Sequence, residues 1–266
     1  TQFSSLDNIL GAVSQLNAAD GEDNSISNQD NTVAISQNLL AENDCNGTGG
    51  NNVICNNSAD GLFNLIFVDI VQTNDATLFG DVSSDQINDL SVGQSGALVN
   101  TCDETGGGIN QATCENTSVA NLIGPISQSN IVDAPNSDTV IQSNGAQVAQ
   151  NLDAVNDCDE DGTGFNSALC RNSPQNEINS ITQENDAVVA DDTVQLNAVD
   201  MNQDIQLENV CDETGLGDNN ALCGSTSSPA NRIGQVGQSN NAEGSGDADF
   251  TQSNNIPTIN QVIAAE

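Results

Sequence analysis

The sequence has 266 residues, with 38 acidic side chains against two basic ones and no histidine, so its formal net charge is −36 at pH 7. This charge argues against nucleic acid and anionic membranes as partners, and favours divalent cations and other copies of the same chain. The lack of Trp and Tyr, the single Met and the six Phe argue against a conventional globular core. Asn and Gln make up roughly a quarter of the residues, a polar load that must be hydrogen-bonded wherever it is buried.

The chain begins with Thr1, which we interpret as the first residue of a mature protein whose signal peptide has been removed. The most apolar run, residues 62–70, is too short to span a bilayer and contains Asp69, so we expect no membrane insertion. The expected location is therefore extracellular, either secreted or on the cell surface.

A short alternating motif, first seen as Val13-Ser-Gln15-Leu-Asn17-Ala-Ala19, occurs five times. In each copy a β-branched residue, Gln, Asn and then Ala or Val occupy every second position, which predicts a strand with one buried face. Subtraction of their positions places successive Gln residues 57, 56, 55 and 55 apart, which indicates a repeat architecture. The Gln and Asn of the five copies are Gln15, Gln72, Gln128, Gln183 and Gln238, and Asn17, Asn74, Asn130, Asn185 and Asn240.

An acidic loop, such as residues 20–25, and a longer alternating segment follow each motif. This segment contains two further Gln. Its apolar residues alternate in phase with the amides and so lie on the same face of the strand, for example from Val140 to Ala154. In the last copy the spacing slips by one residue at Pro257, where a bulge is expected. The first of these Gln are Gln29, Gln86, Gln142, Gln195 and Gln252, each followed two residues later by Asn31, Asn88, Asn144, Asn197 and Asn254; the second are Gln37, Gln94, Gln150, Gln203 and Gln261.

The repeat predicts one all-β repeat domain over residues 1–266, built as a β-solenoid or as stacked β-arches. Its five units cover roughly residues 1–55, 56–114, 115–170, 171–223 and 224–266. If the units stack in register at ~4.8 Å, each amide lies beside its equivalent and can bond to it, so Gln and Asn ladders form inside. A buried amide without a partner costs about 1–3 kcal/mol, so the ladders would fix the register. A hydrated sheet surface is the alternative, but apolar residues on the same face favour burial.

Eight Cys occur as four local pairs around Gly-rich loops. Evenly spaced pairs predict disulfides that close the loops between units, each removing roughly 3 kcal/mol of unfolded-state freedom, and an oxidising exterior. Zinc sites use closer Cys spacing and often His, which disfavours metal binding by these Cys. Disulfides between units or between subunits remain an alternative to the local pairs. The predicted pairs are Cys45–Cys55, Cys102–Cys114, Cys158–Cys170 and Cys211–Cys223.

Three of the Cys loops begin with Cys-Asp-Glu. Stacking brings these acidic pairs together, and like charges at that range repel each other unless a cation lies between them. The pattern therefore leaves two interpretations, solvated carboxylates or a bound Ca²⁺ or Mg²⁺ ion, and no cofactor is required. The residues are Asp103, Glu104, Asp159, Glu160, Asp212 and Glu213.

Asn46, Asn56 and Asn116 begin Asn-x-Ser/Thr sequons, which are candidate glycosylation sites on a secreted surface and also occur by chance. No catalytic constellation is predicted, because the chain has no His or Lys to act as a base and its Cys are expected to be oxidised.

The strand motif Gln-x-Asn-x-Ala, as in Gln15 to Ala19, Gln72 to Ala76 and Gln183 to Ala187, resembles the curlin-type repeat. This resemblance implies a functional amyloid, with stacked β-arches, internal Gln and Asn ladders and secretion as extracellular fibres. The chain departs from the curlin pattern in its longer unit, its inserted Cys loops and its lack of regular Gly and aromatic positions. It is also similar in kind to the Cys-stapled, amyloid-like sheath proteins of filamentous archaea.

We therefore expect an extracellular structural protein, not an enzyme, that polymerises with itself by β-strand stacking into a filament, sheath or matrix fibre. The alternative is a monomeric module, either a calcium-binding adhesin or a ligand-binding β-solenoid.

Overall fold

The computed structural model describes the chain except for residues 1, 4–5, 23–24, 51, 58–61, 67, 137–138, 214–217, 224–228, 245–248 and 266. The described residues form 14 strands and no helix, so the predicted all-β class is confirmed. All strand pairs are parallel and join in one sheet. The strands are β1 (Gln2–Phe3), β2 (Leu6–Leu10), β3 (Val13–Glu22), β4 (Ile26–Thr48), β5 (Asn52–Asn56), β6 (Leu62–Ile66), β7 (Ile70–Phe79), β8 (Ser83–Ile123), β9 (Ile126–Ala134), β10 (Thr139–Val189), β11 (Asp192–Glu213), β12 (Asp218–Cys223), β13 (Ala230–Gly244) and β14 (Phe250–Ala265).

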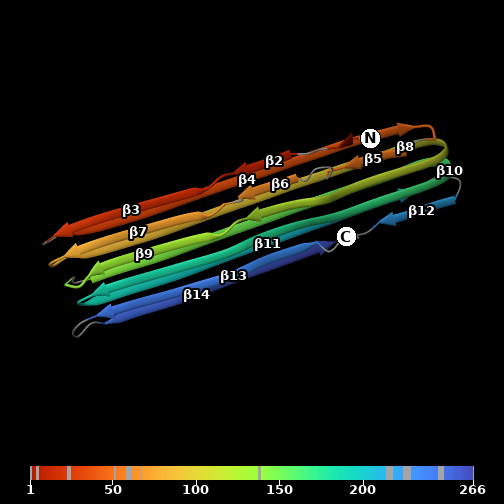
Figure 1. Ribbon diagram of the computed structural model, residues 1–266. Coiled ribbons are helices and arrows are strands. Elements are labelled where there is room, and N and C mark those ends of the chain that lie inside the picture. Colours follow the sequence, from red (N-terminus) through yellow and green to blue (C-terminus); the bar gives the residue numbers. More distant parts are fainter. Residues whose placement is uncertain are drawn as a thin grey trace.

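The sheet is curled, so that two rows of strands face each other (Figure 1). The first row contains β3, β7, β9, the last part of β10 and β13, paired in that order. The strands β2 and β6 and the end of β8, which precede β3, β7 and β9 along the chain, belong to the same row. The second row contains β4, β8, the first part of β10, β11 and β14. The chain crosses from the first row to the second at the acidic loops and returns at the Cys loops.

Each strand pairs with the strand whose sequence it resembles, and equivalent residues lie side by side. Gln72 of β7 is in register with Gln15 of β3 and with Gln128 of β9, as the spacing of the motif predicts. The register is interrupted between Ala198 and Asp200 of β11, whose partners in β14 are Asn255 and Thr258. One extra residue of β14 therefore bulges at Pro257, which confirms the expected irregularity.

The tight turns at both ends of the rows depend on glycine. Gly80, between β7 and β8, has a φ of 98°, and Gly49, in the first Cys loop, has a φ of 97°. Residues with a Cβ rarely adopt this left-handed conformation, so glycine lets the chain reverse between rows within few residues.

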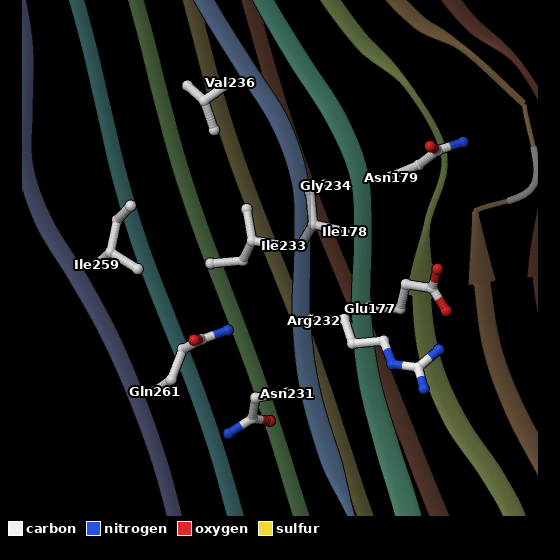
Figure 2. A pocket seen from close by; sticks show the side chains of 10 residues that line it. All are labelled: Glu177, Ile178, Asn179, Asn231, Arg232, Ile233, Gly234, Val236, Ile259 and Gln261. Atoms are coloured by element: carbon white, nitrogen blue, oxygen red, sulfur yellow. The ribbon is translucent and has the colours of Figure 1, made fainter.

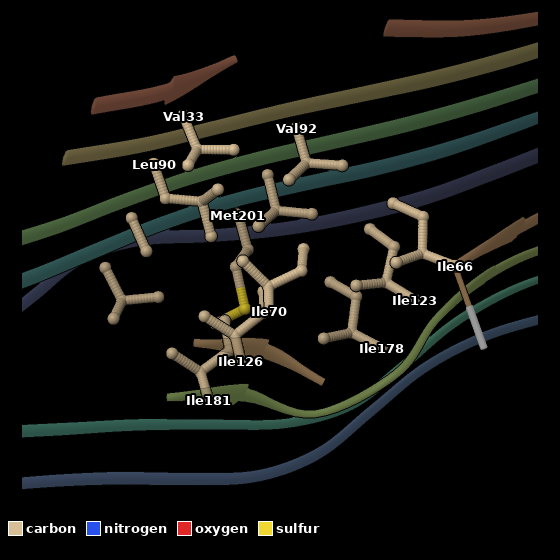
Figure 3. Close-up of a cluster of buried hydrophobic side chains, with 13 residues drawn as sticks. Val33, Ile66, Ile70, Leu90, Val92, Ile123, Ile126, Ile178, Ile181 and Met201 are labelled. Carbon is tan, nitrogen blue, oxygen red and sulfur yellow. The ribbon is translucent and has the colours of Figure 1, made fainter. Parts of the chain in front are cut away.

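Alternate side chains point into the space between the rows, as the buried-exposed alternation along β4, β7 and β10 shows. The largest apolar cluster joins both rows: Val33, Leu90 and Met201 come from the second row and face isoleucines of the first (Figure 3). These isoleucines are Ile66, Ile70, Ile123, Ile126, Ile178 and Ile181. Small and branched aliphatic residues thus fill an interior that is only two side chains thick.

Replacement of Ile126 by Ala should lower the free energy of unfolding by about 2–5 kcal/mol, because Ile126 is 1 % exposed and its loss leaves a cavity in the cluster. Urea denaturation of dilute protein measures this change. Ile131→Ala is the matched control, since Ile131 is 39 % exposed on the outer face of the same strand, and its effect should stay within about 0.5 kcal/mol. Equal effects of the two substitutions would contradict the assignment of the inner face.

Candidate functional site

A continuous ladder of asparagine amides runs through the centre of the molecule and joins the two rows. The Nδ2 of Asn74 donates to the Oδ1 of Asn88 across the interior (3.2 Å) and to the Oδ1 of Asn130 along the row (2.9 Å). The same pattern repeats along both rows, through buried positions in the middle and partly or fully exposed ones at the ends, so each amide bonds within its row and across it. The members are Asn17, Asn31, Asn74, Asn88, Asn130, Asn144, Asn185, Asn197, Asn240 and Asn254.

Glutamine amides form separate ladders along each row. In the second row, the Nε2 of Gln86 donates to the Oε1 of Gln29 at 2.7 Å, and the Nε2 of Gln142 donates to the Oε1 of Gln86 at 3.0 Å. The same Nε2 atoms also donate to backbone carbonyls of the facing row, such as that of Ile131. The three ladders are Gln15, Gln72, Gln128, Gln183 and Gln238; Gln29, Gln86, Gln142, Gln195 and Gln252; and Gln37, Gln94, Gln150, Gln203 and Gln261.

The two kinds of ladder have opposite directions. Each Gln amide nitrogen points toward the preceding copy of the motif, as Gln142 does toward Gln86. Each Asn amide nitrogen points toward the following copy, as Asn88 does toward Asn144. The first and last strands of the rows therefore present different donors and acceptors.

A second asparagine ladder flanks the disulfides. The sequence shows Asn two residues before the first Cys of each loop, but the partners of these Asn lie two residues after the second Cys. Asn100 donates to Asn116 at 3.0 Å and to Asn156 at 2.9 Å. The spacing Cys-x-Asn after the second Cys is the signal that sequence reasoning missed. The members are Asn43, Asn57, Asn100, Asn116, Asn156, Asn172 and Asn209.

This ladder corrects one of the glycosylation candidates. Asn116 is fully buried and its amide is hydrogen-bonded to Asn172, so no glycan can be attached to it in this fold. Asn46 is exposed and Asn56 is half-buried, so both sequons remain at the surface.

All four predicted disulfides are present: Cys45–Cys55, Cys102–Cys114, Cys158–Cys170 and Cys211–Cys223, with Cα atoms 6.1 to 6.7 Å apart. No Cys is free, which leaves none for a bond to another subunit. The disulfides lie in a column, since the sulfur atoms of Cys102, Cys114 and Cys158 are within 4.8 Å of one another. The disulfides indicate an oxidising, extracellular environment. The part of the chain that the structure describes has no helix able to cross a membrane.

The structure separates the acidic residues of the Cys loops into two sets. Glu104 and Glu160 are 0 % exposed and lie inside the loops, whereas Asp103 and Asp159 are half-buried on the outer side. Asp212 is exposed, and the side chain of Glu213 lies outside the described residues. The six carboxylates therefore do not form one cluster.

Both sets contain a carboxyl group whose pKa is displaced. Burial raises the pKa of Glu104, and the negative charge of Asp103 raises it further. On the outer side, burial raises the pKa of Asp159, and the like charges of Asp161, Asp103, Asp212 and Asp157 add to the effect in that order.

A hollow lies where the rows end, between β13 and β14. It has a volume of about 720 Å³ and is lined by residues such as Ile233, Val236, Ile259 and Gln261 (Figure 2). Their equivalents in preceding strands fill the interior, so the hollow is the end of the space between the rows.

Comparison of the chain with protein-family models, with curated proteins and with solved structures finds no match. The resemblance to curlin-type repeats therefore depends on the strand motif alone.

Replacement of Asn130 by Asp should lower the free energy of unfolding by more than about 3 kcal/mol at neutral pH. The Nδ2 of Asn130 donates to Ser143, Asn144 and Asn185 at 2.9–3.1 Å, and a carboxylate would place a buried negative charge against these acceptors. Urea denaturation measures the loss. Asn151→Asp makes the same change at an exposed position of β10 and should leave the stability nearly unchanged.

Proposed function

We propose that this protein is an extracellular structural subunit, a β-solenoid of five stacked turns that polymerises by adding copies of itself to the ends of its sheet. The proposal gives the chain a structural role and no catalytic one. The observation that carries it is that the two ends of the sheet differ and complement each other. We call β13 and β14 the trailing edge, and β2, β3 and β4 the leading edge.

The trailing edge exposes side chains of the inner face. Ile259 and Ile263 of β14 are 51 % and 46 % exposed, although Met201 and Ile205, their neighbours in register, are 0 % exposed. Solvated apolar residues on an unpaired strand are a template for pairing with another chain. At the leading edge, Leu10, Val13 and Ile35 are likewise only partly buried against the apolar cluster. If the leading edge of a second copy packed on the trailing edge of the first, the apolar side chains of both edges would be buried.

The amide ladders support a fixed direction for this contact. In the described chain, no donor reaches the Oε1 atoms of Gln238, Gln252 and Gln261, so the trailing edge offers Gln acceptors. At the leading edge, the Nε2 of Gln15 donates, among the residues that the structure describes, only to the carbonyl of Thr32, whereas the Nε2 of Gln72 has an additional Gln acceptor.

The Asn ladder has the converse pattern. The Oδ1 of Asn17 accepts no hydrogen bond from the described residues, while the Nδ2 of Asn254 has a single long contact of 3.5 Å, to Gln238. Donors and acceptors of the two edges therefore match when Gln15 lies on Gln238 and Gln29 lies on Gln252. A head-to-tail contact between two different surfaces generates an open filament when successive copies are stacked along one axis without a rotation that closes a ring.

Polymerisation should be abolished by Ile259→Lys, because the charge would be buried against the leading edge of the next copy. The monomer should keep its fold, since Ile259 is already exposed within one chain. Wild-type protein should form filaments with a reflection near ~4.7 Å, seen by negative-stain microscopy and fibre diffraction, and the variant should sediment as a monomer.

Ile87→Lys is the matched control, because Ile87 points outward from the middle of the stack and is 37 % exposed. It should leave filament formation intact. A small fraction of Ile259→Lys mixed with wild-type protein should shorten the filaments. The intact leading edge of the variant still binds to a filament end, but its altered trailing edge does not accept the next copy. A wild-type protein that stays monomeric at high concentration would contradict the proposal and favour a monomeric binding module.

A further inference from the structure

The Cys-loop end of the molecule contains a buried pair of carboxylates. Glu104 of β8 and Glu160 of β10 are in register on adjacent strands, and both are 0 % exposed. Adjacent strands in a sheet are about 4.8 Å apart, a range at which two carboxylates repel strongly in a low-dielectric interior. Burial of such a pair is costly unless a carboxyl group is protonated or a cation lies between the two.

The described part of the chain supplies no such positive charge. The chain has only two basic residues. Arg171 lies 3.6 Å from Glu115, and Arg232 is in register with Glu177 in the first row. Among the described residues, neither carboxylate oxygen of Glu104 has a hydrogen-bond partner.

An amide oxygen on the opposite strand of the loop is an independent sign of a missing ligand. Asn110 is fully buried, and its Nδ2 donates to the carbonyl of Gly106 (3.3 Å) and to the Oδ1 of Asn166 (3.1 Å). Its own Oδ1 accepts no hydrogen bond from the described residues. In the neighbouring ladder, by contrast, the Oδ1 of Asn116 accepts from both Asn57 and Asn100. Since Asn110 lies across the loop from Gly106, two residues beyond Glu104, its oxygen and the carboxylate share the inner face.

We propose that the interior of the Cys-loop end binds one Ca²⁺ ion between Glu104 and Glu160, with the Oδ1 of Asn110 as a third ligand. Carboxylate and amide oxygens are the ligands that Ca²⁺ uses, and its double charge balances the two glutamates. Gly47 of β4 is in register with Glu104 of β8. A Cβ on residue 47 would collide with the Glu104 carboxylate, so glycine leaves room for that carboxylate. The outer residues Asp103, Asp159 and Asp212 are not part of the site. Binding takes place within a single chain and does not depend on polymerisation.

The test compares Glu104→Gln with Asp103→Asn, which removes the same charge from the neighbouring outward side chain. Calorimetric titration of metal-free protein with Ca²⁺ should show one tight site per chain above the weak binding expected of an acidic surface. Glu104→Gln should weaken that site more than about tenfold, and Asp103→Asn should leave it unchanged. Titration with Mg²⁺ should give weaker binding, because Mg²⁺ demands stricter geometry.

Thermal unfolding provides a second readout. Ca²⁺ should raise the Tm of the wild type and of Asp103→Asn, whereas Glu104→Gln should already have a raised Tm in chelator and should not respond to Ca²⁺. Should that variant fail to fold, Glu160→Gln serves instead. The backbone N–H of Ala112 donates to the Oε1 of Glu160 at 2.7 Å, and the amide oxygen of the glutamine can still accept this hydrogen bond. An unchanged wild-type Tm in millimolar Ca²⁺, or equal loss of binding in the Asp103 and Glu104 variants, would overturn the proposal.

Discussion

The structure depends on one constraint: an amide buried away from water must find hydrogen-bond partners inside the protein. A side-chain amide has both donors and acceptors, so identical amides in register satisfy one another. Asn88, for example, is fully buried and bonds to Asn130 and Asn144 as well as to a backbone carbonyl. A slip of one residue would turn every inner amide outward and every outer acid inward, so the ladders fix the register of the whole sheet.

The same constraint explains why the ends of the sheet are chemically different. A ladder of amides has a direction, because each nitrogen donates to the next oxygen. The Gln and Asn ladders run in opposite directions, so each edge carries a mixed set of donors and acceptors that matches the other edge. The apolar side chains between the amides add contact area without direction. In the assembly that we propose, this combination would favour the addition of copies with one orientation over random association.

The Cys-loop end obeys the constraint less completely. The amides of the Asn ladder around Asn116 are hydrogen-bonded, but Glu104 and Asn110 have buried oxygens that no donor of the described residues reaches. A carboxylate cannot continue an amide ladder unless it gains a proton or a cation, because an ionised carboxyl group has no donor. This is why the inner glutamates, rather than the more numerous outer aspartates, are the candidates for binding an ion.

The sequence by itself determined the strand periodicity, the pairs of Cys and the alignment of equivalent residues such as Gln72 and Gln128, because spacing along the chain dictates which side chains share a face. The position of Pro257 likewise predicted the bulge in β14. Only the tertiary structure decided that Asn74 faces Asn88 across the interior, that Asn116 is buried, and that Glu104 points inward while Asp103 points outward. These contacts join residues of opposite rows, and their distance in space follows from how the sheet curls, which no local spacing encodes.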